Sequence, residues 1–206
     1  VYLGRIYFAI LVTFAFLIAV IEFLNLYKVS GLEKYYTSLL FLLAIAIYYY
    51  GQIKWLVFLP MLFFLSVPVF WNKGVSIISQ TLSFFILSYA FLGAVSALII
   101  RQKLGFRGIL FFLAIIWIFD TMAYLCGYFF GKHKLAVKIS PKKTVEGYIY
   151  GIIFTLPFGY ILHILKITPF KGFRYSLAFT LIISVLSQIG DLVESSFKRE
   201  VGVKDS

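Results

Sequence analysis

Long apolar stretches, separated by short groups of charged residues, glycine and proline, run through the whole sequence. A helix needs about 20 mostly apolar residues to cross the hydrocarbon core of a bilayer. Seven stretches approach or exceed that length: residues 6–27, 35–50, 53–71, 75–100, 109–130, 148–165 and 175–197. They predict an all-α fold, a polytopic helical membrane bundle with about seven spans. The alternating pattern of a membrane β-barrel is absent from these stretches.

The composition excludes the common soluble classes. Of the 206 residues, 62% are hydrophobic and 13% are charged, and the mean hydropathy is +0.98. Soluble domains have roughly 45–50% apolar and about 25% charged residues. The single cysteine, Cys126, excludes a disulfide scaffold. The sequence therefore predicts an integral membrane protein.

The basic residues predict the orientation in the membrane. If all seven stretches cross, the polar loop 131–147 and the tail after residue 197 lie on the same face. That face carries 11 of the 19 Lys and Arg residues: Lys28, Lys34, Lys73, Lys132, Lys134, Lys138, Lys142, Lys143, Lys198, Arg199 and Lys204. Because basic residues favour the cytoplasmic side, we expect the loop and the tail in the cytoplasm. The net charge of +11 is explained by lipid headgroups and topology, so it does not indicate a nucleic-acid partner.

The last apolar stretch carries a polar stripe. Ser184, Gln188, Asp191, Ser195 and Lys198 follow at spacings of 4, 3, 4 and 3, which places them on one face of a helix. Glu194 lies three residues after Asp191, and two carboxylates this close repel unless a cation, a proton or a basic side chain separates them. Hard oxygen ligands of this kind suit Mg²⁺. The alternative is an ion pair of Asp191 with Lys198 or with another helix, which would only stabilise the bundle.

Asp120 is the most deeply placed charge in the fifth stretch. An ionisable residue inside a membrane span is a candidate for a functional site. We expect Asp120 to act as a metal ligand or as an orienting hydrogen-bond acceptor, with a structural hydrogen bond as the alternative. Glu22 in the first stretch has no charged neighbours and is a weaker candidate.

The loop 131–147 has a composition typical of an oligophosphate site. Lysines supply positive charge, hydroxyls supply hydrogen bonds, and the helix that follows begins with free backbone N–H groups. The candidates for phosphate binding are Ser140, Lys142, Lys143, Thr144 and Glu146. The spacing of a P-loop is absent. The alternative is a basic loop that contacts lipid headgroups.

Four linked motifs resemble the phosphatidate cytidylyltransferases, also called CDP-diacylglycerol synthases. They are Asp120-Thr121-x-Ala123-Tyr124, Gly131-Lys132-His133-Lys134-Leu135, Ser140-Pro141-Lys142-Lys143-Thr144-x-Glu146-Gly147, and Gly190-Asp191-Leu192-x-Glu194-Ser195-x-x-Lys198-Arg199 with Lys204-Asp205-Ser206. The resemblance covers about the last 90 residues. It implies a multi-pass enzyme of the inner membrane that condenses CTP with phosphatidate to give CDP-diacylglycerol and pyrophosphate, with Mg²⁺ required.

The resemblance also implies roles for these residues. Asp191 would hold metal ions, with Asp120 and Glu194 as further candidate ligands. Lys142, Lys143, Lys198 and Arg199 would balance the triphosphate, the leaving group or the lipid phosphate. More than one metal ion is expected, and a monovalent cation and a homodimer are left open. The family signature continues beyond Ser206, so we expect the sequence to be part of a longer protein.

Two parts of the chain differ in their predicted roles. Residues 1–108 are expected to form transmembrane scaffold helices, and residues 109–206 to form the catalytic transmembrane helices with the cytoplasmic Lys-rich loop 131–147. Two other functions remain open: a cation-coupled membrane transporter, and a nucleotidyltransferase that acts on another lipid phosphate. A purely structural scaffold would leave the acidic residues of the second part unexplained.

Overall fold

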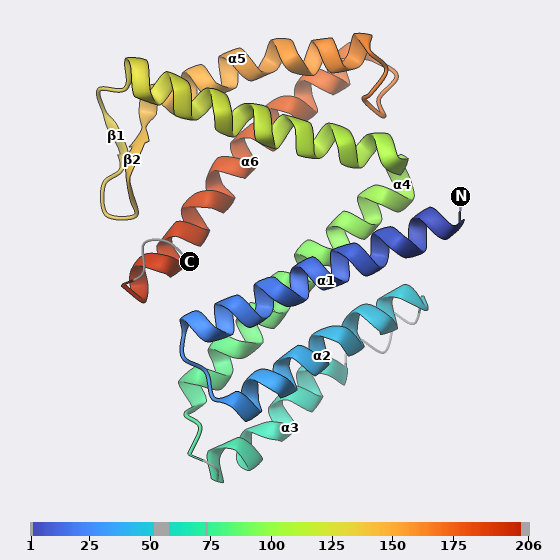
Figure 1. Cartoon of the computed structure of the whole chain (residues 1–206), viewed down its shortest axis with the longest axis vertical. Coiled ribbons are helices and arrows are strands. Elements are labelled where there is room, and N and C mark those ends of the chain that lie inside the picture. The colour runs from blue at the N-terminus through green and yellow to red at the C-terminus, as the bar shows by residue number, and fades with distance from the viewer. Residues whose placement is uncertain (1, 52–57, 73, 203–206) are drawn as a thin grey trace. The chain divides into compact units, whose positions relative to one another are not determined.

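The structure is a computed structural model that describes residues 2–51, 58–72 and 74–202 (Figure 1). The chain folds into two compact units, Val1–Gln102 and Lys103–Ser206. Almost all of the regular structure is helical, as the apolar stretches predict. The first residues of the expected third span and the segment Lys204-Asp205-Ser206 lie outside the described residues, as does Lys73. The roles predicted for the two parts of the chain stay predictions.

The N-terminal unit is built from three helices and the first part of a fourth. These are α1 (Tyr2–Leu26), α2 (Gly31–Tyr49), α3 (Phe58–Asn72) and α4 (Ile77–Phe130). In Figure 1, α1 and α2 run side by side. The main core cluster joins α1, α2 and α4 through buried side chains that include Val20, Leu24, Phe41, Ile86 and Ala94.

A buried carboxylate connects α2 to α4 in this unit. Glu33, in the first turn of α2, is only 1% exposed. Its two carboxylate oxygens accept hydrogen bonds from the hydroxyls of Ser79, at 2.8 Å, and Ser83, at 2.7 Å. The Ser30 hydroxyl caps α2 by accepting a hydrogen bond from the backbone N–H of Glu33 at 3.3 Å. Glu33 therefore joins the beginnings of two helices through polar contacts in an apolar setting.

Replacing Glu33 is expected to destabilise the N-terminal unit. Glu33→Ala removes two hydrogen bonds to a charged group and leaves a buried gap, so we expect a loss on the order of 1–3 kcal/mol in the free energy of unfolding. Thermal unfolding in detergent measures the loss as a lower Tm. The matched control is Glu22→Ala, because Glu22 is exposed on α1. Equal Tm values for the two variants would contradict a stabilising role for the Glu33 contacts.

A break at Gly105 divides α4. The helix has 54 residues, and at about 1.5 Å per residue an unbroken helix of that length would far exceed the roughly 30 Å hydrocarbon core. Gly105 has φ 71° and ψ −165°, a conformation that side chains with a Cβ rarely adopt. The expected fourth and fifth spans, 75–100 and 109–130, fall on either side of this break.

Four of the described helices are long and apolar enough to cross a membrane: residues 4–26 of α1, α4, α5 (Val145–Ile164) and α6 (Phe173–Glu200). With the break, α4 is long enough for two of the expected spans. Helix α2 matches the second expected stretch and α3 matches part of the third, but neither is among the four. The all-α membrane fold follows from these helices, whereas the count of seven crossings stays a prediction.

The C-terminal unit contains the rest of α4, a short hairpin, α5 and α6. The hairpin strands are β1 (Lys134–Ala136) and β2 (Ser140–Thr144), paired antiparallel with Lys134 opposite Thr144 and Ala136 opposite Ser140. The sequence predicted only a polar loop here, since so short a hairpin carries no periodic apolar pattern. In Figure 1, the beginning of α5 lies against the second part of α4, and α5 packs along α6.

Small residues bring the helices of this unit close together. A Cβ added at Gly147 would lie 2.7 Å from the Ala123 carbonyl oxygen and 2.8 Å from Cα of Gly127. One at Gly151 would lie 3.0 Å from Ala123. The beginning of α5 therefore packs directly against the backbone of α4. Because α4 carries Asp120 and the hairpin leads into α5, this close packing positions the candidate site.

Candidate active site

An ion pair joins the hairpin to α6. The ammonium group of Lys143, on β2, contacts Asp191 Oδ2 on α6. The Lys143 side chain is 23% exposed and the Asp191 side chain is 51% exposed, so the pair lies at an accessible surface. The sequence predicted both residues as site residues but not that they contact each other. Asp191 thus pairs with a lysine of the hairpin, whereas the sequence had suggested Lys198 or another helix as its partner.

Asp120 lies near this pair. The hydroxyl of Ser187 on α6 contacts Asp120 Oδ1 on α4 at 3.5 Å. Asp120 also interacts electrostatically with both Asp191 and Lys143. The structure therefore gathers residues from α4, β2 and α6 into one polar cluster, which we call the Asp120–Asp191 cluster: Asp120, Lys143, Ser187 and Asp191. Ser187 was not predicted; its position four residues before Asp191 was the available signal.

The last turns of α6 supply further charges. Lys198 Nζ pairs with Glu194 Oε1 at 2.8 Å, one helical turn apart. Arg199 Nε donates a hydrogen bond to the backbone carbonyl oxygen of Ile139 at 3.1 Å, which ties the turn of the hairpin to α6. Glu194 therefore has a cationic partner on its own helix. The structure does not connect Glu194 to Asp120, the other tentative metal ligand.

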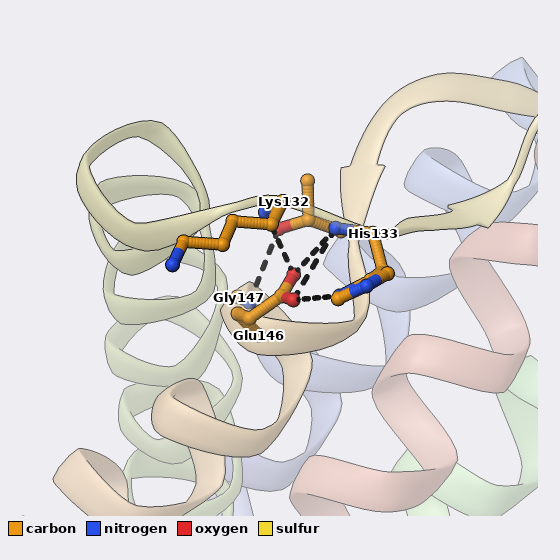
Figure 2. Close-up of polar contacts among 5 residues, drawn as sticks. Lys132, His133, Glu146 and Gly147 are labelled. Carbon is orange, nitrogen blue, oxygen red and sulfur yellow. Dashed lines mark hydrogen bonds and ion pairs between the residues drawn. The ribbon is translucent and has the colours of Figure 1, made fainter.

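Glu146 anchors the hairpin to the first turn of α5. Its carboxylate accepts hydrogen bonds from the backbone N–H groups of Lys132, at 3.0 Å, and His133, at 3.0 and 3.2 Å. The His133 ring nitrogen Nδ1 lies 2.5 Å from Glu146 Oε1. Figure 2 shows the Glu146 carboxylate directed at these groups. Glu146 therefore holds the start of the hairpin against the first turn of α5.

Thr144 has a similar structural contact. Its hydroxyl caps α5 by accepting a hydrogen bond from the backbone N–H of Gly147 at 3.1 Å, and the residue is buried. Of the five loop residues predicted to bind phosphate, Thr144 and Glu146 therefore bond to the backbone of the loop and of α5, and Lys143 pairs with Asp191 on α6. Lys142 is exposed, and Ser140 begins β2.

The donor set fits a hard divalent cation that also binds phosphate. Asp120 and Asp191 supply carboxylate oxygens from two helices, and Ser187 supplies a hydroxyl. Mg²⁺ commonly takes one or two protein carboxylates and completes its shell with water and substrate phosphates. In the part of the chain that the structure describes, no group of three or more His, Cys, Asp or Glu residues could hold a metal alone. A metal ion held by Asp120 and Asp191 would therefore need water or phosphate oxygens to complete its shell.

Comparison with known proteins identifies the family. The model of the family described as "Cytidylyltransferase family" matches residues 1–206, the whole chain. The chain belongs to the cytidylyltransferase family. Membership confirms the family resemblance carried by the sequence motifs. It gives no support to a cation-coupled transporter, the alternative that the acidic residues had left open.

Relatives in this cytidylyltransferase family carry a more specific name. Proteins named phosphatidate cytidylyltransferase are 45% identical over 106 residues in Staphylococcus saprophyticus, 43% over 102 residues in Staphylococcus epidermidis and 46% over 106 residues in Staphylococcus aureus. Each match covers 50% of this chain and 39% of the relative. The chain thus matches about two fifths of the length of these relatives.

Proposed function

We propose that the protein containing this chain transfers the cytidylyl group of CTP to phosphatidate, giving CDP-diacylglycerol and pyrophosphate. The observation that carries the proposal is the Lys143–Asp191 pair beside Asp120. In this pair a lysine, which commonly binds phosphate, lies against carboxylates, which commonly bind Mg²⁺, and the chain belongs to the cytidylyltransferase family. The name of the staphylococcal relatives supports phosphatidate as the acceptor.

The reaction needs no covalent enzyme intermediate. A phosphate oxygen of phosphatidate attacks the α-phosphorus of CTP in line, a new P–O bond forms, and the bond to the β-phosphate breaks to release pyrophosphate. The nucleophile is already anionic, so the protein mainly positions the reactants and balances their charge.

We assign the following roles in this reaction to the described residues. Asp191 and Asp120 would hold Mg²⁺, more than one ion being expected, and bound Mg²⁺ would neutralise phosphate charge and orient the phosphates. Lys142 and Lys143 would bind the triphosphate. Lys198 and Arg199 lie on the last turns of α6 and would serve the leaving group or the lipid phosphate.

The ion pair suggests how the site stays intact between turnovers. Before substrate binds, Lys143 balances the charge of Asp191. Binding of CTP with Mg²⁺ would give each side chain a new partner, phosphate for Lys143 and metal for Asp191. Each of the two side chains would then have a partner of opposite charge both before and after the substrate binds.

The membrane setting is part of the proposal. We infer seven crossings in a bacterial inner membrane, with the hairpin and the end of α6 on the cytoplasmic side, where CTP is soluble. The lipid would enter the site from the bilayer. The homodimer and the monovalent cation considered from the sequence remain predictions.

Pyrophosphate release tests the proposed function. Detergent-solubilised full-length protein is given CTP, Mg²⁺ and phosphatidate, beside reactions that omit each of them in turn. Release that needs all three is the expected result. Release with another lipid phosphate but not with phosphatidate would assign a different acceptor. No release by folded protein with CTP and any lipid phosphate would overturn the proposal.

A further inference from the structure

A buried amide nitrogen without a hydrogen-bond partner lies on α6 about one helical turn before Asp191. Gln188, on α6, is 8% exposed, and its Nε2 makes no hydrogen bond. Among the described residues of the C-terminal unit, Gln188 is the only one with a buried side-chain nitrogen or oxygen that has no hydrogen-bond partner. Leaving such a nitrogen unpaired costs stability, so an unpaired donor one helical turn from a candidate metal ligand is a candidate for a contact with the substrate.

The position of Gln188 on α6 limits what that ligand is. Gln188 precedes Asp191 by three residues, on the same face of the helix and about 4.5 Å along its axis. It lies on the side of Asp191 away from the charged end with Lys198 and Arg199, and it directly follows Ser187, which contacts Asp120. Under the proposed orientation, Gln188 is deeper in the bilayer than the charged groups.

The chemistry of the substrates then selects the ligand. Phosphates and metal would be bound by the charged residues of the Asp120–Asp191 cluster, and a neutral amide adds little to them. In phosphatidate, the two acyl ester groups lie on the bilayer side of the phosphate. Their carbonyl oxygens accept hydrogen bonds. An amide N–H is a matching donor for such an oxygen.

We propose that the Gln188 amide donates a hydrogen bond to an acyl ester carbonyl of the lipid substrate, and so selects diacyl lipid phosphates over lipid phosphates without an ester. The inference rests on the proposed function, and it names a residue that determines specificity at the same site. A lipid with ether linkages, or an isoprenoid phosphate, would leave the amide buried and unpaired. Sites built to hydrogen-bond a substrate group reject analogues that lack the group.

The test compares two lipids that differ only in the linkage. Full-length protein is assayed for kcat/KM with diacyl phosphatidate and with dialkyl ether phosphatidate of the same chain length. We expect the wild type to prefer the ester lipid about 5- to 20-fold. In Gln188→Leu the preference is expected to fall to about twofold or less, mainly because kcat/KM for the ester lipid decreases. Gln188→Met, which keeps a similar volume, is a second variant in case the first folds poorly.

Gln80 offers a matched control. It is also a buried glutamine, 2% exposed, and both atoms of its amide lack a hydrogen-bond partner, but it belongs to the N-terminal unit. Gln80→Leu is therefore expected to keep the ester preference of the wild type. A merely structural role of Gln188 would lower kcat/KM for both lipids equally and leave their ratio unchanged.

The outcomes of this test are distinct. Equal kcat/KM for the two lipids in the wild type overturns the inference and leaves the proposed function standing. The inference is likewise overturned, with the proposed function intact, if Gln188→Leu and Gln188→Met keep the full preference. No turnover of either lipid by folded wild type overturns the proposed function, and the inference with it.

Discussion

Asp191→Asn is expected to lower kcat/KM for CTP by roughly 100- to 1,000-fold, as the loss of a charged group at a phosphoryl-transfer centre does. The amide keeps the size of the carboxylate but loses the charge that would hold Mg²⁺ and that pairs with Lys143. The measurement is pyrophosphate release over a Mg²⁺ titration. Part of the lost activity should return at high Mg²⁺ if the defect is metal affinity.

Two carboxylates on the same helix serve as comparisons. Glu200→Gln is expected to stay within about twofold of the wild type, because Glu200 is exposed at the end of α6 and lies outside the proposed site. Glu194→Gln tests the tentative metal role: Glu194 pairs with Lys198, and an effect well below that of Asp191→Asn would assign it to that pair. Full activity in Asp191→Asn would contradict the proposed metal site.

Lys143→Met is expected to lower kcat/KM for CTP by roughly 100-fold. The substitution removes a charge that would bind the triphosphate, and this interaction would be stronger in the transition state than in the ground state. Methionine keeps much of the apolar length of the side chain. The control is Lys138→Met, because Lys138 is exposed in the turn between β1 and β2. Equal losses for the two variants would mean that only the total charge of the hairpin matters.

The double variant Lys143→Met with Asp191→Asn tests whether the two residues act as a unit. Residues in contact show interaction energies, whereas independent residues show additive losses. We therefore expect the double variant to lose clearly less activity than the product of the two single losses. A loss equal to that product would show that the ion pair has no bearing on turnover.

The sequence predicted the helices well because every backbone group must be hydrogen-bonded in a membrane, and a long apolar stretch achieves this within itself when it is a helix. It also predicted the stripe on α6, since spacing within one helix determines which residues share a face. Asp120, Lys143 and Asp191, all predicted as site residues, lie close to one another in the structure.

The contacts between elements could not be predicted in the same way. Lys143 and Asp191 are 48 residues apart, and their contact depends on a hairpin shaped by backbone hydrogen bonds to Glu146 and by Arg199. Neither of those contacts produces a periodic pattern in the sequence. Glu33 was overlooked for a related reason: its serine partners lie 46 and 50 residues away on another helix.

The anchored hairpin has a consequence for the nucleotide affinity that the proposed function requires. Its start is held by Glu146, its turn by Arg199, and its second strand by the contact of Lys143 with Asp191. A flexible loop would lose conformational entropy on binding a triphosphate, and that loss would weaken the affinity. Under the proposed function this ordering would take place during folding, so the exposed Lys142 would be presented on a preorganised hairpin, and more of the attraction between lysine and phosphate would remain available as binding free energy.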